Sequence, residues 1–421
     1  MKKVILYTLF ISLSIIWSCE EKPVEETYVS ARKNLTSKIL YDLMDECYFW
    51  NKTITDKPDL SKDPLQLFQD FIYKPIDKWS FIISTKEFRE YYKSGIYVGY
   101  GFSFGEDENG DLRISQIFKN SPLYSKGIRR GWIIKSINGI NLNTNINIYS
   151  LIENSDVQSN TFVFIDPKQQ QVEFEFSKIE IVMNTVIFDS IYIQNEKKIG
   201  YLVFSSFIET SKEELNTVFK KFRENNINEL IVDLRYNGGG SGEIGYLLGG
   251  LIGGEKVKDN IIVKYIHNDN LEDKNQSFNF NVNENCVNIS RAVFITSRGT
   301  ASASEMVING LSPYMDVLMV GDSTHGKPMG MYAWEFDDYT VLPITFKIAN
   351  SLDYGDYFSG LPANSFVKDD LSHDFGDTNE TCFNEALYYI KTGGFTSPKP
   401  LKSKKVKKYS PTGWQLEKNV F

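Results

Sequence analysis

The residues best suited to chemistry in this sequence are a serine and a lysine in neighbouring segments. Ser302 lies in the small-residue run TASASE (residues 300–305), and Lys327 follows in the run THGKP (residues 324–328). A serine hydroxyl becomes a good nucleophile when a base accepts its proton, and a lysine amine is such a base when its pKa is lowered to about 7–8. Ser302 and Lys327 could therefore act as nucleophile and general base without a histidine.

The segments around this pair predict how it is positioned. Residues 291–296 are an apolar run rich in β-formers, a polar break follows, and residues 302–311 have the pattern of a helix. Ser302 would then lie at a strand-to-helix turn, near the positive end of the helix dipole, where an oxyanion is stabilised. A second strand at residues 317–320 leads to the loop that carries Lys327. The alternative is that Ser302 only begins a helix and that Lys327 is solvated.

A glycine-rich turn is the third chemical feature. Residues 230–241 read LIVDLRYNGGGS, so that a buried strand ends at Asp233 and Arg235 and three glycines follow. Consecutive glycines allow backbone N–H groups to point at a ligand, as an oxyanion hole requires. A nucleotide-binding P-loop is disfavoured because no Gly-Lys-Ser/Thr follows the glycines. We interpret Asp233 and Arg235 as supports of this turn rather than as catalytic groups.

An upstream segment indicates a peptide-binding module. Residues 100–104 read YGFSF, and residues 120–139 read NSPLYSKGIRRGWIIKSING. This pattern resembles a PDZ domain. The resemblance implies a loop whose N–H groups hold the C-terminal carboxylate of a peptide that adds as a strand to a sheet edge. The loop residues are Tyr100, Gly101, Phe102 and Ser103.

Taken together, these motifs resemble the C-terminal processing (tail-specific) protease family of serine peptidases. The motifs that carry the resemblance are DLRYNGG (residues 233–239), GTASASE (299–305) and GK (326–327). Residues 77–82, DKWSFI, also resemble a segment that family members carry just before the PDZ domain. The resemblance implies an α/β protein with a crotonase-like or ClpP-like α/β spiral core, a PDZ domain and an N-terminal helical region.

The same resemblance assigns roles to residues of the site. It implies that Ser302 is the nucleophile and Lys327 the general base. It places the oxyanion hole at the N–H of Ala303 and at one glycine of the 238–240 run, with Gly238 or Gly239 favoured. The expected reaction is hydrolysis of peptide bonds near the free C-termini of protein substrates, with no cofactor and no metal.

One position departs from the family pattern. Bacterial members often place a glutamine four residues after the lysine, where it orients the amine, and this chain has Met331 there. A thioether cannot donate a hydrogen bond, so the lysine must be oriented in another way. A PDZ peptide-binding adaptor that lost turnover therefore stays open. A carrier of small apolar ligands is a second alternative, which the PDZ module argues against. His325 is the alternative base.

Composition limits the other possibilities. The chain has 421 residues, 42% of them hydrophobic and 14% aromatic, which is enough for two or three domains with real cores. Its net charge of −8 argues against a nucleic-acid partner. The lysine-rich stretch at residues 399–408 is interpreted as a solvated tail. The His and Cys residues have no spacing typical of a metal site.

The first residues predict export. Lys2 and Lys3 precede a short apolar run, which is typical of a signal peptide. Ser18 before Cys19 resembles a bacterial lipoprotein processing site, which implies a lipid anchor at Cys19, although simple cleavage is the alternative. The expected location is the bacterial outer membrane, facing the periplasm or the cell surface. The other cysteines are Cys47, Cys286 and Cys382, of which Cys286 and Cys382 could pair.

The expected organisation is a signal peptide (1–18), a lipidated tether (19–28), an N-terminal helical domain (29–94), a PDZ domain (95–178), the protease core (179–395) and a basic tail (396–421). In the core, residues 211–214 (SKEE) are predicted to open a helix with a capping box. Residues 172–177 alternate as an edge strand does. Further helices are expected at residues 244–251 and 380–390.

Overall fold

The computed structural model describes residues 24–142, 148–152 and 158–396. The predictions of a signal peptide, of lipidation at Cys19 and of a basic tail lie outside these residues. No helix within the described part is long and apolar enough to span a membrane. Within the same part, Cys47, Cys286 and Cys382 are free thiols, so the Cys286–Cys382 pair is absent.

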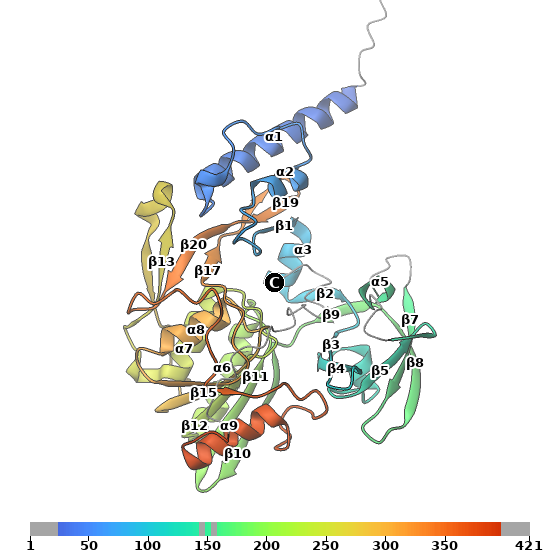
Figure 1. Ribbon diagram of the computed structural model, residues 1–421, viewed down its shortest axis with the longest axis vertical. Helices are drawn as coiled ribbons and strands as arrows, with labels where there is room; N and C mark the ends of the chain where they lie inside the picture. Colours follow the sequence, from blue (N-terminus) through green and yellow to red (C-terminus); the bar gives the residue numbers. More distant parts are fainter. Residues whose placement is uncertain (1–23, 143–147, 153–157, 397–421) are drawn as a thin grey trace, which may run out of the picture.

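A six-stranded sheet forms the core of the lower part of the molecule as drawn in Figure 1. Its order is β10-β11-β12-β15-β16-β21, and all neighbours are parallel except β10 and β11. The strands are β10 (Val186–Gln194), β11 (Lys197–Phe204), β12 (Glu229–Asp233), β15 (Arg291–Thr296), β16 (Asp316–Gly321) and β21 (Ser365–Phe366). The predicted strand at residues 291–296 coincides with β15.

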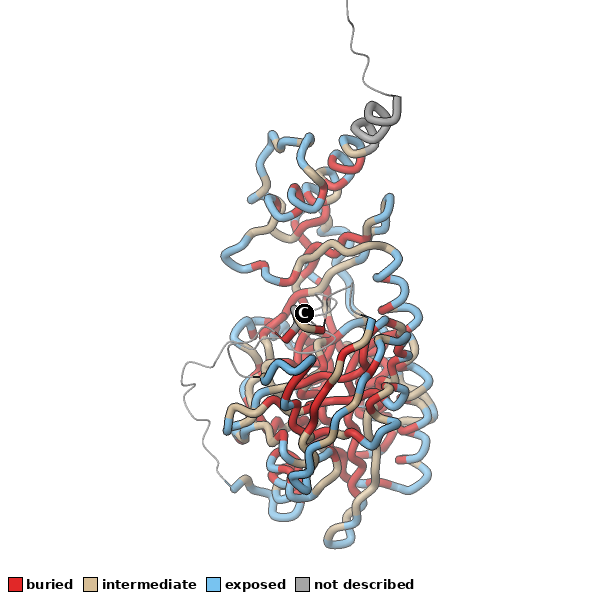
Figure 2. Tube along the Cα trace, turned by 90° about the vertical axis from the view of Figure 1, so that its right-hand side faces the viewer, coloured by how far each residue is buried: buried red, intermediate tan, exposed pale blue. Residues whose placement is uncertain are grey.

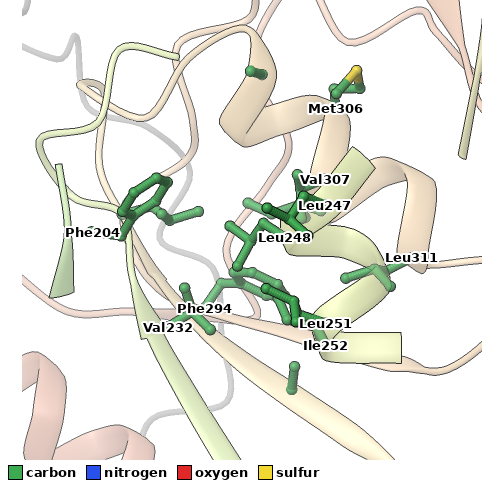
Figure 3. Close-up of a cluster of buried hydrophobic side chains, with 14 of the residues drawn as sticks. Phe204, Val232, Leu247, Leu248, Leu251, Ile252, Phe294, Met306, Val307 and Leu311 are labelled. Atoms are coloured by element: carbon green, nitrogen blue, oxygen red, sulfur yellow. The ribbon is translucent and has the colours of Figure 1, made fainter. Parts of the chain in front are cut away.

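Helices cover both faces of this sheet. They are α6 (Ser211–Glu224), α7 (Gly242–Gly253) and α8 (Ala303–Leu311) on one face and α9 (Thr381–Thr392) on the other. Leu230 and Val232 of β12 pack with α6, α7 and α8, whereas Ile231 packs with α9. Figure 3 shows the first of these cores, with Val232 and Phe294 of the sheet beside Leu248 and Leu251 of α7. Successive side chains of a strand point to opposite faces of the sheet, and helices cover both faces. These strands are therefore apolar throughout.

A second sheet forms an arm beside the six-stranded sheet. It has the order β14-β13-β20-β17 and is antiparallel. The strands are β13 (Ile261–His267), β14 (Gln276–Asn279), β17 (Met329–Met331) and β20 (Ile344–Ala349). Short helical turns connect this region, η3 (Gly254–Lys256) and η4 (Asp269–Lys274). β17 begins two residues after Lys327, so the arm positions the lysine loop.

The N-terminal region is helical only in part. It contains α1 (Val24–Cys47), η1 (Asn51–Thr53), α2 (Pro64–Phe71), α3 (Thr85–Phe88) and the π-helix η2 (Arg89–Ser94). The expected N-terminal helical domain (29–94) contains these helices and also β1 (Phe81–Ser84), which forms a sheet with β19 (Tyr339–Leu342) and β18 (Trp334–Phe336). The N-terminal region therefore shares a sheet with the segment that follows the lysine loop.

Residues 96–182 form a separate small β-module. A ribbon of β2 (Ile96–Gly99) and β9 (Ile179–Val182) connects it to the rest of the chain. Its sheet has the order β3-β4-β5-β7-β8, with β6 (Ile140–Asn141) beside β5. The other elements are β3 (Phe102–Glu106), β4 (Leu112–Ile117), α4 (Pro122–Ser125), β5 (Ile133–Ile137), α5 (Ile148–Ile152), β7 (Ser159–Ile165) and β8 (Gln171–Ser177). The predicted edge strand at residues 172–177 is β8.

The predicted capping box at residues 211–214 does not form. The Ser211 hydroxyl donates to the carbonyl of Ser206, and the Glu214 carboxylate accepts from the N–H groups of Thr185 and Val186 at 3.0 and 2.8 Å. A tertiary contact has replaced the local cap. Figure 2 shows that buried residues are concentrated in the central sheet and its helices and extend upward into the N-terminal region.

Candidate active site

Ser302 lies where β15 gives way to α8, as the sequence predicted. It is the residue directly before α8 and has φ 55° and ψ −115°. A non-glycine residue in this conformation is strained, and such strain is concentrated at functional sites. The surrounding turn is tied to the glycine turn, because the Asn237 carbonyl accepts from Ala301 N at 3.1 Å and from Ser304 Oγ at 3.0 Å.

The glycine turn lies directly against Ser302. A Cβ on Gly239 would lie 2.8 Å from Cβ of Ser302 and 3.0 Å from N of Ala303. Gly239 also has φ 101°, so the position requires glycine for its conformation and for its space. The N–H of Gly239 already donates to Asn237 Oδ1 at 2.9 Å. Of the two glycines that the sequence left open as oxyanion donors, the geometry therefore favours Gly238.

Ala303 is the first residue of α8. The first N–H groups of a helix have no acceptor within that helix and point along its positive end. The Ala303 N–H is therefore suited to receive an oxyanion next to Ser302. Ser302, Gly238 and Gly239 line one cavity of about 670 Å³.

Lys327 lines the same cavity but is itself buried, with 4% of its surface exposed. Burial lowers the pKa of Lys327 to about 8, and the negative charges of Asp77 and Glu305 act in the opposite direction. A substantial fraction of the amine is therefore neutral near pH 8, as a general base requires. The interpretation of Lys327 as a solvated loop residue was wrong.

Glu305 joins the serine turn to the lysine loop. Its carboxylate accepts from the N–H of Ser302 at 2.9 Å, from Gly326 at 2.7 Å and from Lys327 at 2.9 Å. The Thr324 hydroxyl donates to it as well, at 2.5 Å. Glu305 is fully buried, and burial raises the pKa of its carboxyl. Glu305 therefore stabilises both the start of α8 and the lysine loop.

His325 is not available as the alternative base. Its Nε2 accepts from Trp79 Nε1 at 3.1 Å, and its Nδ1 lies 3.3 Å from the carbonyl of Arg298. These contacts engage both ring nitrogens, with the proton on Nδ1. Burial lowers the pKa of His325 to about 4, with a contribution from the charge of Lys78. The ring is therefore a neutral structural group.

Aromatic side chains form the opposite wall of the cavity. Tyr265 of β13 stacks on Phe346 of β20 with ring centroids 3.9 Å apart, and Tyr246 stacks on Phe278 at 5.1 Å. Met331 lines the cavity too, so the position of the departure from the family lies in the site. No local sequence pattern marked this wall, because its residues come from α7, β13, β14 and β20.

The predicted peptide-binding loop lies elsewhere. Tyr100, Gly101, Phe102 and Ser103 lead into β3, which is an edge strand of the small module. Gly101 has φ 76°, and a Cβ there would lie 2.8 Å from that of Ser121. These four residues do not line the cavity of Ser302.

A buried cluster of charges lies beneath the glycine turn. Arg235 binds Asp233 at 2.7 Å, Glu380 at 2.7 Å and Asp369 at 2.7 Å, and it is 1% exposed. Arg130 of the small module binds Asp369 as well, at 2.9 Å. The interpretation of Asp233 and Arg235 as supports fits these contacts. Within the described residues, no group of three His, Cys, Asp or Glu side chains is arranged to hold a metal ion.

Two protein-family models match parts of the chain. Residues 198–360 match the model of peptidase family S41, and residues 36–81 match the model of the peptidase S41 N-terminal domain. The chain is thus similar to peptidase family S41 over these two segments. The first match contains Gly238, Ser302 and Lys327, and the second contains Asp77 and Trp79.

Curated relatives are named as CtpA or CtpA-like proteases. A protein of Staphylococcus aureus named as a CtpA-like serine protease is 23% identical over 314 residues, which are 73% of this chain and 59% of the relative. The carboxy-terminal processing protease CtpA of Bacillus subtilis is 26% identical over 57% of this chain and 49% of its own length. The chain thus spans about half to three fifths of the length of these relatives.

Solved structures share the fold. A structure from Bacteroides fragilis named as an S41 protease has a TM-score of 0.70 at 23% identity and covers 84% of this chain and 97% of its own. The photosystem II D1 C-terminal processing protease has a TM-score of 0.51 at 15% identity and covers 80% and 93%. The mixed α/β fold is therefore that of the S41 proteases.

Proposed function

We propose that this protein is a serine endopeptidase that uses Ser302 and Lys327 to hydrolyse peptide bonds near the C-termini of protein substrates. The observation that carries the proposal is the common cavity, where a strained Ser302, a buried Lys327 and the glycine turn meet. The similarity to peptidase family S41 supports the same reaction class. The aromatic wall of the cavity suits apolar segments of an extended substrate.

The proposed mechanism assigns a step to each of these groups. Neutral Lys327 accepts the proton of the Ser302 hydroxyl while the oxygen attacks the carbonyl carbon of the peptide bond. The N–H groups of Ala303 and Gly238 stabilise the oxyanion. Protonated Lys327 then gives its proton to the leaving amine. Water, deprotonated by Lys327, hydrolyses the acyl-enzyme and releases Ser302.

Recruitment is assigned to the small module. We propose that residues 95–178 are a PDZ domain, that its residues 100–103 hold a substrate carboxylate, and that the peptide extends along β3. Support comes from the position of β3 at the edge of its sheet and from the positive φ of Gly101 beside it. We further propose a crotonase-like or ClpP-like spiral for the core, a signal peptide at residues 1–18 and lipidation at Cys19, which would anchor the protein to the outer membrane.

Cleavage of an unstructured protein with an apolar C-terminus tests the function. Wild type should cleave it, and Ser302→Ala and Lys327→Ala should not, while all three proteins keep the same circular dichroism. A labelled peptide with a free C-terminus should bind more tightly than its amidated form. Wild type that binds the free C-terminus without cleaving any substrate would favour the adaptor. Equal binding of both peptides would contradict recruitment through the carboxylate.

A further inference from the structure

The segment DKWSFI at residues 77–82 has no role in the mechanism above, yet it lies against the lysine loop. Asp77 is 3% exposed and Trp79 is 4% exposed, although both belong to the N-terminal region. Trp79 packs in a core with Met329, which follows the lysine loop, and with Ile344 of β20. The turn of residues 77–80 therefore forms one side of the environment of Lys327.

Hydrogen bonds fix this turn internally. The Asp77 carboxylate accepts from the Tyr48 hydroxyl at 2.8 Å, from the N–H groups of Trp79 and Ser80 at 2.9 and 3.0 Å, and from the Ser80 hydroxyl at 2.5 Å. A buried carboxylate with four donors is held in one orientation. The position of its charge is thus defined by the fold rather than by solvent.

The same turn holds the lysine segment on both sides. Before the lysine, Trp79 Nε1 donates to His325 Nε2 at 3.1 Å. After it, the N–H of Ile344 donates to the Ser80 hydroxyl at 2.8 Å, and Ile344 is the β20 partner of Met331. The turn therefore contacts the loop two residues before Lys327 and the hairpin that follows it.

We propose that Asp77 and Trp79 are positioning residues for Lys327. They take over the role of the orienting glutamine, whose position is occupied by Met331 in this chain. Trp79 fixes the loop through His325, and Asp77 places a negative charge near the amine. The lysine segment is then clamped between Glu305 on one side and the N-terminal turn on the other. This inference rests on the proposed function, because it describes how the base of that reaction is held.

The charges that face Lys327 make the inference testable through pH. Asp77 comes from the N-terminal turn and Glu305 from α8, and both raise the pKa of Lys327 against the effect of burial. His325 is neutral, and the cations Lys78 and Arg298 lie near its ring. Removal of the Asp77 charge should therefore lower the pKa of Lys327 further, by roughly one unit.

The first experiment compares pH profiles of kcat/KM for wild type, Asp77→Asn and Tyr48→Phe. Asp77→Asn should move the acidic limb to lower pH by roughly one unit. Tyr48→Phe removes a hydrogen bond from the same carboxylate but keeps its charge, so its limb should stay in place. Asp70→Asn, an exposed acid of the same region, is the second control. A limb that does not move in Asp77→Asn overturns the assignment of Asp77.

Trp79→Phe tests the other contact. Its result also keeps the proposal testable if Asp77→Asn does not fold. Trp79→Phe keeps an aromatic ring but removes the donor to His325, so kcat should fall while KM and the limb stay unchanged. Unchanged kcat overturns the assignment of Trp79.

Competitive acetylation of Lys327 over a range of pH, quantified by mass spectrometry, reports the state of the amine without turnover. Wild type without peptidase activity would overturn the proposed function, and the acetylation profiles would still decide whether Asp77 acts on Lys327. Identical profiles in wild type and Asp77→Asn would reject that action.

Discussion

Replacement of Lys327 by methionine should abolish turnover and stabilise the fold at the same time. Burial lowers the pKa of Lys327 from its ordinary value of 10.5 to about 8. Because one pKa unit corresponds to about 1.4 kcal/mol, the charged amine destabilises the folded state by about 3 kcal/mol. Methionine has a similar volume and no charge, so it removes this penalty and leaves no large cavity.

The penalty has a defined dependence on pH. Below pH 8 the folded and unfolded states both bind the proton, and the penalty is complete. Between pH 8 and 10.5 the unfolded chain binds more protons than the folded protein, so wild type becomes more stable relative to the variant as pH rises. Lys327→Met should exceed wild type in free energy of unfolding by about 3 kcal/mol at pH 7 and by about 1.5 kcal/mol at pH 9.5.

Urea unfolding followed by circular dichroism at both pH values measures this difference. Lys212→Met, which alters an exposed lysine of α6, is the matched control and should show no such dependence on pH. Peptidase activity of the same preparation gives the second readout. Two outcomes would refute the reasoning that burial of the amine costs stability. One is a Lys327→Met variant that is less stable than wild type at pH 7. The other is a difference in free energy of unfolding that does not change with pH.

Three further predictions concern the supports and the wall of the site. Glu305→Ala leaves three buried N–H groups without their acceptor, so activity should vanish and urea unfolding should show a loss of about 3 kcal/mol or more; near-normal turnover would contradict its linking role. Arg235→Met leaves buried carboxylates unpaired and should destabilise by about 3–5 kcal/mol, whereas Arg89→Met, at an exposed pair, should change little. Phe278→Ala opens the aromatic wall, and kcat/KM should fall about tenfold for peptides with large apolar residues near the cleaved bond but not for alanine-containing peptides; equal losses for both would exclude a role in selectivity.

The sequence predicted those parts of the site that depend on local pattern. The strand at residues 291–296, the turn at Ser302 and the helix after it follow from a change in hydrophobic period, and all three lie as expected. The glycine turn after β12 was also recognised, because the glycines follow a buried strand and no Gly-Lys-Ser/Thr comes after them. The choice between Gly238 and Gly239 could not be made from the chain. It depends on the side chain of Asn237, which engages one of the two N–H groups.

Other features depend on contacts between distant residues. Trp79 and His325 are 246 positions apart in sequence, so no periodicity indicates their hydrogen bond. The strand β1 was missed because it is four residues long and is stabilised by β19, not by its own pattern. The capping box at residues 211–214 failed for the same reason, because the carboxylate of Glu214 found two backbone donors outside its helix. In each case, tertiary contacts overrode local propensity.

The burial of Lys327 connects these observations. A lysine is useful as a base only if water is kept from its amine. Burial of an ammonium with no negative charge nearby, however, would cost too much free energy for the protein to fold. Glu305 and Asp77 offset part of that cost from two sides, and backbone N–H donors, including that of Lys327 for Glu305, hold each carboxylate in place. The pKa of the amine thus stays within a few units of neutral pH. A methionine at position 331 is compatible with this arrangement, because the surrounding charges and the fixed loop already define where the amine lies.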